Sequence, residues 1–173
     1  ARHHRVVGSV ALGVEARAKL DDLLEHHLDE TGADVRLAMD ALGSIDALEY
    51  MICRQIRARL RETMTECFHS VDIVASPTTN AIAPSYPLDE RSTPIFDTEA
   101  IRSLTRYSML ANLTGFPAGS LPVGLTDGLP VGLQLMGDAW DEASVLAAMA
   151  HAERLGLTGL PEPASFLRHA SRT

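Results

Sequence analysis

The clearest pattern along the chain is a set of apolar residues spaced three or four positions apart. That spacing places them on one face of an α-helix. It is most regular after Ser44, which we expect to cap a long helix that ends near His69. Residues 1–13 show no clear period. Further helices are expected over residues 14–30, 34–42, from Asp97 towards 112–115, and 142–155, the last capped by Asp141, ended by Gly156 and facing inward with Val145, Leu146, Met149 and Ala152.

Three segments have the composition of β-strands. Residues 71–76 form a short β-branched run. Residues 118–125 and 130–136 flank the pair Asp127-Gly128, which favours a tight hairpin turn because such a turn needs positive φ angles. Glycines within the last strand indicate a close approach of another group. Helices and strands in this order predict a layered α/β fold, and we expect residues 1–173 to form a single domain.

Candidate binding residues follow the first expected strand. Residues 77–97 read as a long, proline-rich loop, and loops of that length in compact domains are usually functional. Thr78, Thr79 and Asn80 open this loop at the end of a strand, where α/β sheets tend to bind ligands, although the hydroxyls could instead satisfy turn amides. Gln134 is expected to be a buried amide that either supports the sheet or contacts a substrate.

Composition narrows the function classes. The formal net charge is −8, and the 15 cationic residues are spread out, so direct binding of nucleic acid is not expected. No apolar run approaches the roughly 20 residues that span a bilayer, so no membrane segment is expected. Cys53 and Cys67 fall on one expected helix, too far apart for a disulfide. Free thiols fit a reducing cytoplasm.

Few residues offer chemistry of their own. Glycine-rich phosphate loops and a G-x-S-x-G elbow are absent from the sequence, and its two adjacent histidine pairs lack the spacing of helical metal ligands. We therefore expect neither a metal nor an organic cofactor. Ser76 ends a strand without a partner base. Lys19 is the one lysine, and its helical setting does not suit a buried base. Arg106 could pair either with a substrate carboxylate or with a surface acid.

Several motifs together resemble those of amidase signature enzymes. The order and spacing agree over roughly residues 44–156. The matching segments are Val71-Asp72 through Pro77-Thr78, Asn112 through Gly115, Pro117 through Gly124, Asp127 through Gly137, and Glu142 at the start of the last helix. Since the chain begins at Ala1, we expect it to be the C-terminal portion of such an enzyme.

This resemblance implies a mixed central sheet flanked by helices and hydrolysis of a carboxamide C–N bond by a Ser–cis-Ser–Lys triad. The chain contains neither a Ser-Ser pair nor a Gly-Gly-Ser run, so no catalytic residue is expected here. It would supply scaffold and part of the pocket for a small-molecule amide. The partner would be the N-terminal half of the domain, in the same or a separate chain. Alternatives are a piece of the A-type component of a glutamine-dependent tRNA amidotransferase, or a non-catalytic structural or binding module. A homo-oligomer is also compatible with the sequence.

Overall fold

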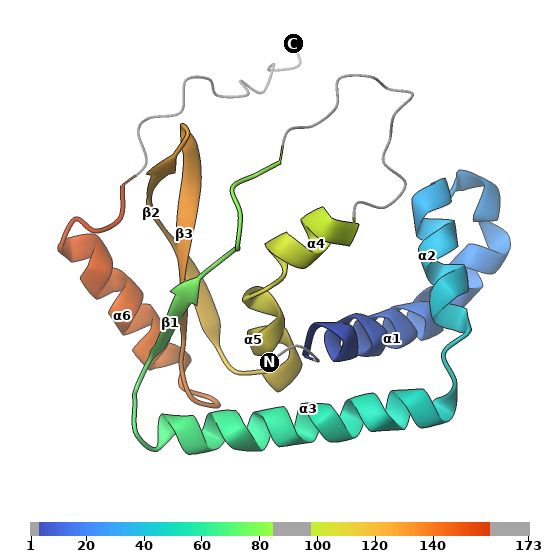
Figure 1. Cartoon of the computed structure of the whole chain (residues 1–173), viewed down its shortest axis with the longest axis horizontal. Helices are drawn as coiled ribbons and strands as arrows, with labels where there is room; N and C mark the ends of the chain where they lie inside the picture. Colours follow the sequence, from blue (N-terminus) through green and yellow to red (C-terminus); the bar gives the residue numbers. More distant parts are fainter. Residues whose placement is uncertain (1–3, 85–97, 160–173) are drawn as a thin grey trace, which may run out of the picture.

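The computed structural model describes residues 4–84 and 98–159. A small sheet is flanked by helices, which confirms the α/β class (Figure 1). No helix in these ranges is both long enough and apolar enough to cross a membrane. In chain order the elements are α1 (His4–His26), the 3₁₀ turn η1 (Leu28–Glu30), α2 (Ala33–Gly43), α3 (Ala47–Phe68), β1 (Val74–Pro77), α4 (Thr98–Leu104), α5 (Ser108–Thr114), β2 (Ala118–Thr126), β3 (Leu129–Met136) and α6 (Glu142–Arg154).

The described strands form a sheet in the order β1-β3-β2, and both pairs are antiparallel. The described strands thus form no parallel pair. The expected hairpin is confirmed: Asp127 and Gly128 have φ angles of 53° and 77°, the left-handed values that a tight hairpin turn requires. β1 begins at Val74, three residues later than expected. Because β3 is central, β1 and β2 each expose one edge among the described strands.

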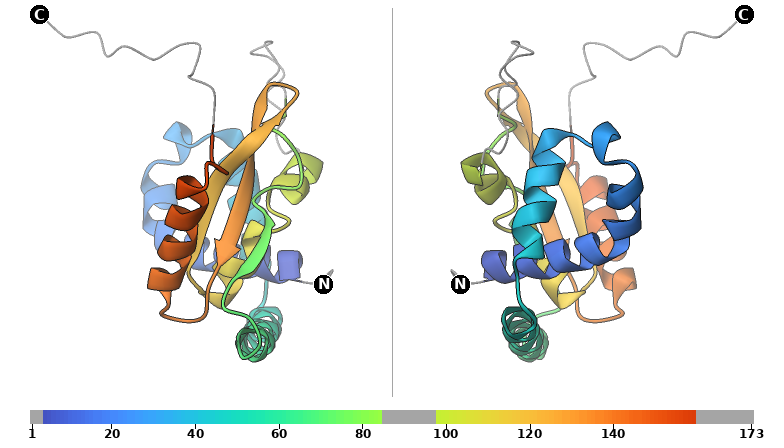
Figure 2. Two further views of the ribbon diagram at one scale, coloured as in Figure 1. Left: turned by 90° about the vertical axis from the view of Figure 1, so that its left-hand side faces the viewer. Right: turned by 90° about the vertical axis from the view of Figure 1, so that its right-hand side faces the viewer.

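Helix α6 covers one face of the sheet (Figure 2). The packing is close at Gly119 of β2, where a Cβ atom would lie 3.1 Å from Met149 Cε and 3.5 Å from Val145 Cγ1. As expected, Asp141 caps the helix, since its side chain accepts a hydrogen bond from a first-turn amide at 3.2 Å. Leu146 is 63% exposed, so the expectation that it faces inward is wrong.

Two apolar clusters join the sheet to the helices. In the first, Met136 at the end of β3 packs with Phe116 and with residues of α3 and α5. In the second, Val7 of α1, Cys53 of α3 and Met109 of α5 pack together. Helix α3 takes part in both clusters and runs along one side of the molecule, under the sheet and under α1 (Figure 1).

Helix α1 begins at His4, ten residues before the expected start. Its first half contains Gly8 and Gly13, which disfavour a helix on their own. Both glycines allow close packing, because a Cβ atom would lie 2.7 Å from Met109 Cγ at Gly8 and 2.8 Å from Leu42 Cγ at Gly13. Contacts with distant elements therefore decide the helical state of this segment.

Two other helix boundaries differ from the prediction. Asp46, not Ser44, caps α3: Asp46 Oδ1 accepts from the Glu49 amide at 2.7 Å, and the Glu49 side chain accepts in return from the Asp46 amide at 3.1 Å. This reciprocal capping box satisfies two free amides rather than one. The helix expected from Asp97 is divided into α4 and α5, and Asp97 itself lies outside the described residues.

Both cysteines lie on α3 and both are free thiols, as predicted. Cys53 is buried and Cys67 is exposed. Burial raises the pKa of the Cys53 thiol, and the negative charge of Glu49 adds to the rise. Cys53 is thus held as the neutral thiol within an apolar cluster.

Candidate functional site

Polar side chains form one group on the sheet face opposite α6. Gln134 of β3 is in register with Ser76 on one side and Ser120 on the other. Gln134 is 8% exposed, and its Nε2 donates to Ser76 Oγ at 3.4 Å. The hydroxyl of Thr78 lies 2.6 Å from that of Ser120. Since burial of an amide is costly without partners, these contacts let Gln134 stay in the sheet.

Gly132 makes room for this polar group. A Cβ atom at this position would lie 2.6 Å from Thr78 Oγ1 and 3.0 Å from Ser120 Oγ. The Thr78 amide also donates to the Gly132 carbonyl at 2.8 Å. The expectation that a glycine in this strand marks a close approach is confirmed. The absent side chain lets the chain leaving β1 lie against the centre of the sheet.

Beyond Thr78 the chain turns towards α4. The Thr79 hydroxyl donates to the Ala81 carbonyl at 2.8 Å, a contact that satisfies the turn itself. The Asn80 amide donates to the Ser103 carbonyl at 3.3 Å, and Asn80 Nδ2 donates to Ser103 Oγ at 3.4 Å. These two bonds fix the position of Asn80 against α4.

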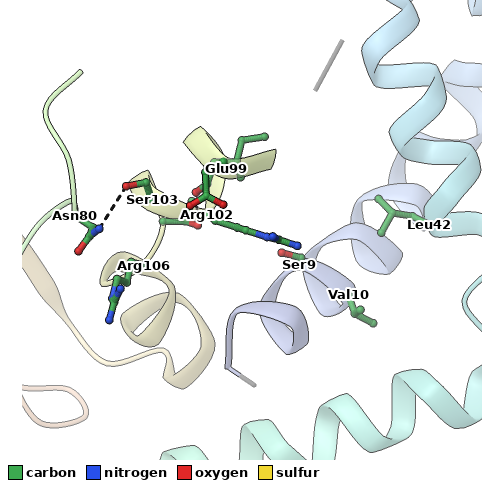
Figure 3. A pocket seen from close by; sticks show the side chains of 10 residues that line it. Ser9, Val10, Leu42, Asn80, Glu99, Arg102, Ser103 and Arg106 are labelled. Carbon is green, nitrogen blue, oxygen red and sulfur yellow. Dashed lines mark hydrogen bonds between the residues drawn. The ribbon is translucent and has the colours of Figure 1, made fainter. Parts of the chain in front are cut away.

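Asn80 lines a pocket of about 630 Å³ between α1, α2, α4 and the segment after β1. Figure 3 shows Asn80 and Arg106 on one side of this pocket, with Ser9, Val10 and Leu42 on the other. The side chain of Arg102 extends between them towards Ser9 (Figure 3). The lining combines charged, amide, hydroxyl and aliphatic groups, as ligand pockets usually do.

Arginines of α3 support the wall of this region from below. Arg57 Nε donates to the Leu113 carbonyl at 2.7 Å, and Arg61 Nη1 donates to the Thr114 carbonyl at 3.2 Å. Both carbonyls lie at the C-terminal end of α5, where the helix dipole favours a positive charge. These bonds fix α5, and with it the connection to α4, against α3.

The four residues predicted to bind substrate therefore fall in three places. Thr78 and Gln134 belong to the polar group on the sheet, Asn80 lines the pocket, and Thr79 serves a local turn. Sequence reasoning missed Ser120 and Ser103, which are the partners of two of them. Alternation along the 118–125 strand places Ser120 on a face with other even-numbered residues, but pairing it with Thr78 required the strand order.

A family model described as Amidase matches residues 6–146. This stretch covers more than half of the 173 residues. The chain belongs to the amidase family. The match begins in α1 and ends within α6, so the helices before residue 44, on which the sequence resemblance did not depend, are also part of the family region.

Curated relatives of this amidase chain include two kinds of protein. The fatty acid amide hydrolase of Oryza sativa subsp. japonica is 34% identical over 169 residues, covering 94% of the chain and 27% of that protein. The Arabidopsis thaliana fatty acid amide hydrolase is 39% identical over 123 residues, covering 70% of the chain and 20% of that protein. A glutamyl-tRNA(Gln) amidotransferase component, the A-type one, from Moraxella catarrhalis is 39% identical over 104 residues, covering 60% and 20%. The chain thus spans between 20% and 27% of these relatives.

Solved structures share the fold of the amidase chain. A crystal structure of an amidase superposes with a TM-score of 0.74 at 24% identity, covering 91% of this chain and 36% of that one. A structure described as a vestigial protein complex that reveals the evolutionary origins of an s-triazine catabolic enzyme gives a TM-score of 0.76 at 19% identity, with coverage of 93% and 36%. At these identities the likeness establishes the fold alone.

Proposed function

We propose that this chain is the C-terminal part of an amidase that hydrolyses the C–N bond of a carboxamide, with water giving a carboxylate and an amine or ammonia. Membership of the amidase family is the observation that carries the proposal. The chain would supply part of the sheet and one wall of the substrate pocket. Thr78, Asn80 and Gln134 are our candidates for shaping that wall, because they lie in or beside the polar group and the pocket.

The reacting groups are proposed to lie outside this chain. A serine nucleophile needs a base that takes its proton and donors that hold the oxyanion. The sequence contains neither the Ser-Ser pair nor the Gly-Gly-Ser run that the family resemblance implies. Lys19, the one lysine, is exposed on α1. The short span of the chain relative to its relatives supports the same division.

The surface supports a partner that completes the domain. Large apolar side chains are more than half exposed on α1, α3 and α6 and on the loop before α6, as Leu12, Leu48, Leu146 and Trp140 illustrate. Exposed apolar surface of this extent marks an interface. Both outer strands of the described sheet also offer unpaired edges. We propose that the N-terminal half of the amidase domain, in the same or a separate chain, covers these surfaces, in a reducing cytoplasm that suits two free cysteines.

Hydrolysis of 4-nitroacetanilide tests this proposal. The full-length protein that contains this chain is expected to release 4-nitroaniline, whereas the isolated 173-residue chain is expected to match a mock preparation. Turnover by the isolated chain would show that catalytic groups lie within it. If the full-length protein releases neither amine nor ammonia from a panel of aryl, alkyl and primary amides, the assignment to amide hydrolysis is wrong.

A second candidate is a piece of the A-type component of a glutamine-dependent tRNA amidotransferase. It is favoured by the 39% identity with the Moraxella catarrhalis protein. This candidate requires ammonia release from glutamine and dependence on a partner protein. The third candidate, a non-catalytic module, predicts that the isolated chain melts cooperatively as a monomer or a defined homo-oligomer in size-exclusion chromatography with light scattering.

A further inference from the structure

The pocket beside Asn80 differs in charge from the rest of the chain. The whole chain has a formal net charge of −8. Among the described residues that line the pocket, Arg102 and Arg106 are basic and Glu99 is the one acid, so two positive charges and one negative charge leave +1. A local positive field in an acidic protein favours an anionic ligand at this place.

The neutral lining complements such an anion. Ser9, Asn80 and Ser103 offer hydroxyl and amide groups to the pocket. Arg102 extends across the pocket towards Ser9, and Arg106 lines it on the Asn80 side (Figure 3). A guanidinium group presents two parallel N–H donors, which match the two oxygens of a carboxylate better than a single hydroxyl.

The remaining lining is aliphatic. Val10 of α1, Leu42 of α2 and Ile101 of α4 contribute apolar surface to the same pocket. A volume of about 630 Å³ holds more than a small inorganic anion. The combination of arginines and aliphatic walls fits a molecule that carries both a carboxylate and a hydrocarbon segment.

We propose that this pocket binds the carboxylate of an amphiphilic amide substrate through Arg102 and Arg106, with the hydrocarbon part against α1 and α2. The inference rests on the proposed function, because it assigns a substrate class to that hydrolysis. The amide bond of such a substrate is cleaved with one water molecule, and the carboxylate that binds the arginines takes no part in the bond changes.

Two matched probes test the inference in the full-length protein. Hexanoylglycine carries a carboxylate, N-hexanoylethanolamine carries a hydroxyl in its place, and both release hexanoate on hydrolysis. We expect the wild type to prefer hexanoylglycine in kcat/KM. Arg102→Gln and Arg106→Gln are each expected to lower kcat/KM for hexanoylglycine at least about tenfold, mainly through KM, as for the loss of a charge-assisted hydrogen bond. The neutral probe should change less than about twofold, as expected for a residue that contacts only the carboxylate.

Arg154→Gln on α6 is the matched control, because it removes an exposed arginine on the far side of the sheet from the pocket. It should leave both probes unchanged. The inference is overturned if the ratio of the two kcat/KM values is the same in the wild type and in both pocket variants, while the neutral probe is still hydrolysed. If the protein hydrolyses neither probe and no other amide, the proposed function fails instead. Calorimetric binding of hexanoylglycine, which needs no turnover, then decides the pocket: loss of binding in both pocket variants supports it, and unchanged binding contradicts it.

Discussion

Replacing Gly132 by alanine should weaken the fold at the centre of the polar group. The new Cβ atom would lie 2.6 Å from Thr78 Oγ1, 2.9 Å from Thr78 Cβ and 3.0 Å from Ser120 Oγ. Thr78 cannot move only its hydroxyl, because its own Cβ is also too close. Overpacking of this kind costs about 1–3 kcal/mol, and the lost hydroxyl pair about 1 kcal/mol. The stiffer unfolded chain of the alanine variant offsets about 0.4–1 kcal/mol. The net expectation is a loss of about 2 kcal/mol.

Urea unfolding of the full-length protein, followed by circular dichroism, measures this loss. Gly159→Ala is the control, because its φ angle is not in the left-handed region and no atom lies within 4 Å of the added Cβ. The Gly132→Ala cost should also shrink in a Ser120→Ala background, which removes one of the crowded hydroxyls. If Gly132→Ala is as stable as Gly159→Ala, the close packing of Thr78 on β3 does not exist and the argument fails.

Two further predictions concern α3. Arg57→Ala should destabilise the protein by about 1 kcal/mol, because the Leu113 carbonyl loses its charged donor, whereas the exposed Arg59→Ala should be within about 0.5 kcal/mol of the wild type in the same urea assay. Equal effects of the two substitutions would contradict the role of Arg57 at the end of α5. Burial, and then a nearby carboxylate, raise the pKa of Cys53, so at neutral pH iodoacetamide should modify Cys67 first. Modification of Cys53 should accelerate only at a pH above the usual thiol range, and equal rates at neutral pH, measured by peptide mass spectrometry, would refute this.

The elements that the sequence predicted well are those fixed by local rules. The turn at Asp127 and Gly128 depends on two adjacent residues that tolerate positive φ angles, and the structure has both. The cap at Asp141 and the end at Gly156, with φ of 68°, likewise depend only on neighbouring amides and carbonyls. Such features need no knowledge of what packs against them.

The predictions that failed depended on distant contacts. The first half of α1 has no apolar period, and its glycines become favourable only where Met109 and Leu42 approach the helix. Leu146 follows the apolar spacing of α6 but is exposed. A period identifies the apolar side of a helix, whereas the width of the surface that covers that side decides which residues are buried.

The candidate site shows why strand order matters more than motif content. Thr78 and Gln134 come from motifs 56 positions apart, and each reads as a short polar side chain beside a strand. They meet because β3 lies between β1 and β2, which aligns Ser76, Gln134 and Ser120 in one row. The β-bulge between Pro122 and Gly124 shifts the pairing of the residues beyond it. A register displaced by one residue would turn Gln134 towards α6, where apolar side chains offer its amide no partner. The polar group is therefore a property of the sheet, and substitutions that alter the register should affect it even when they touch none of its members.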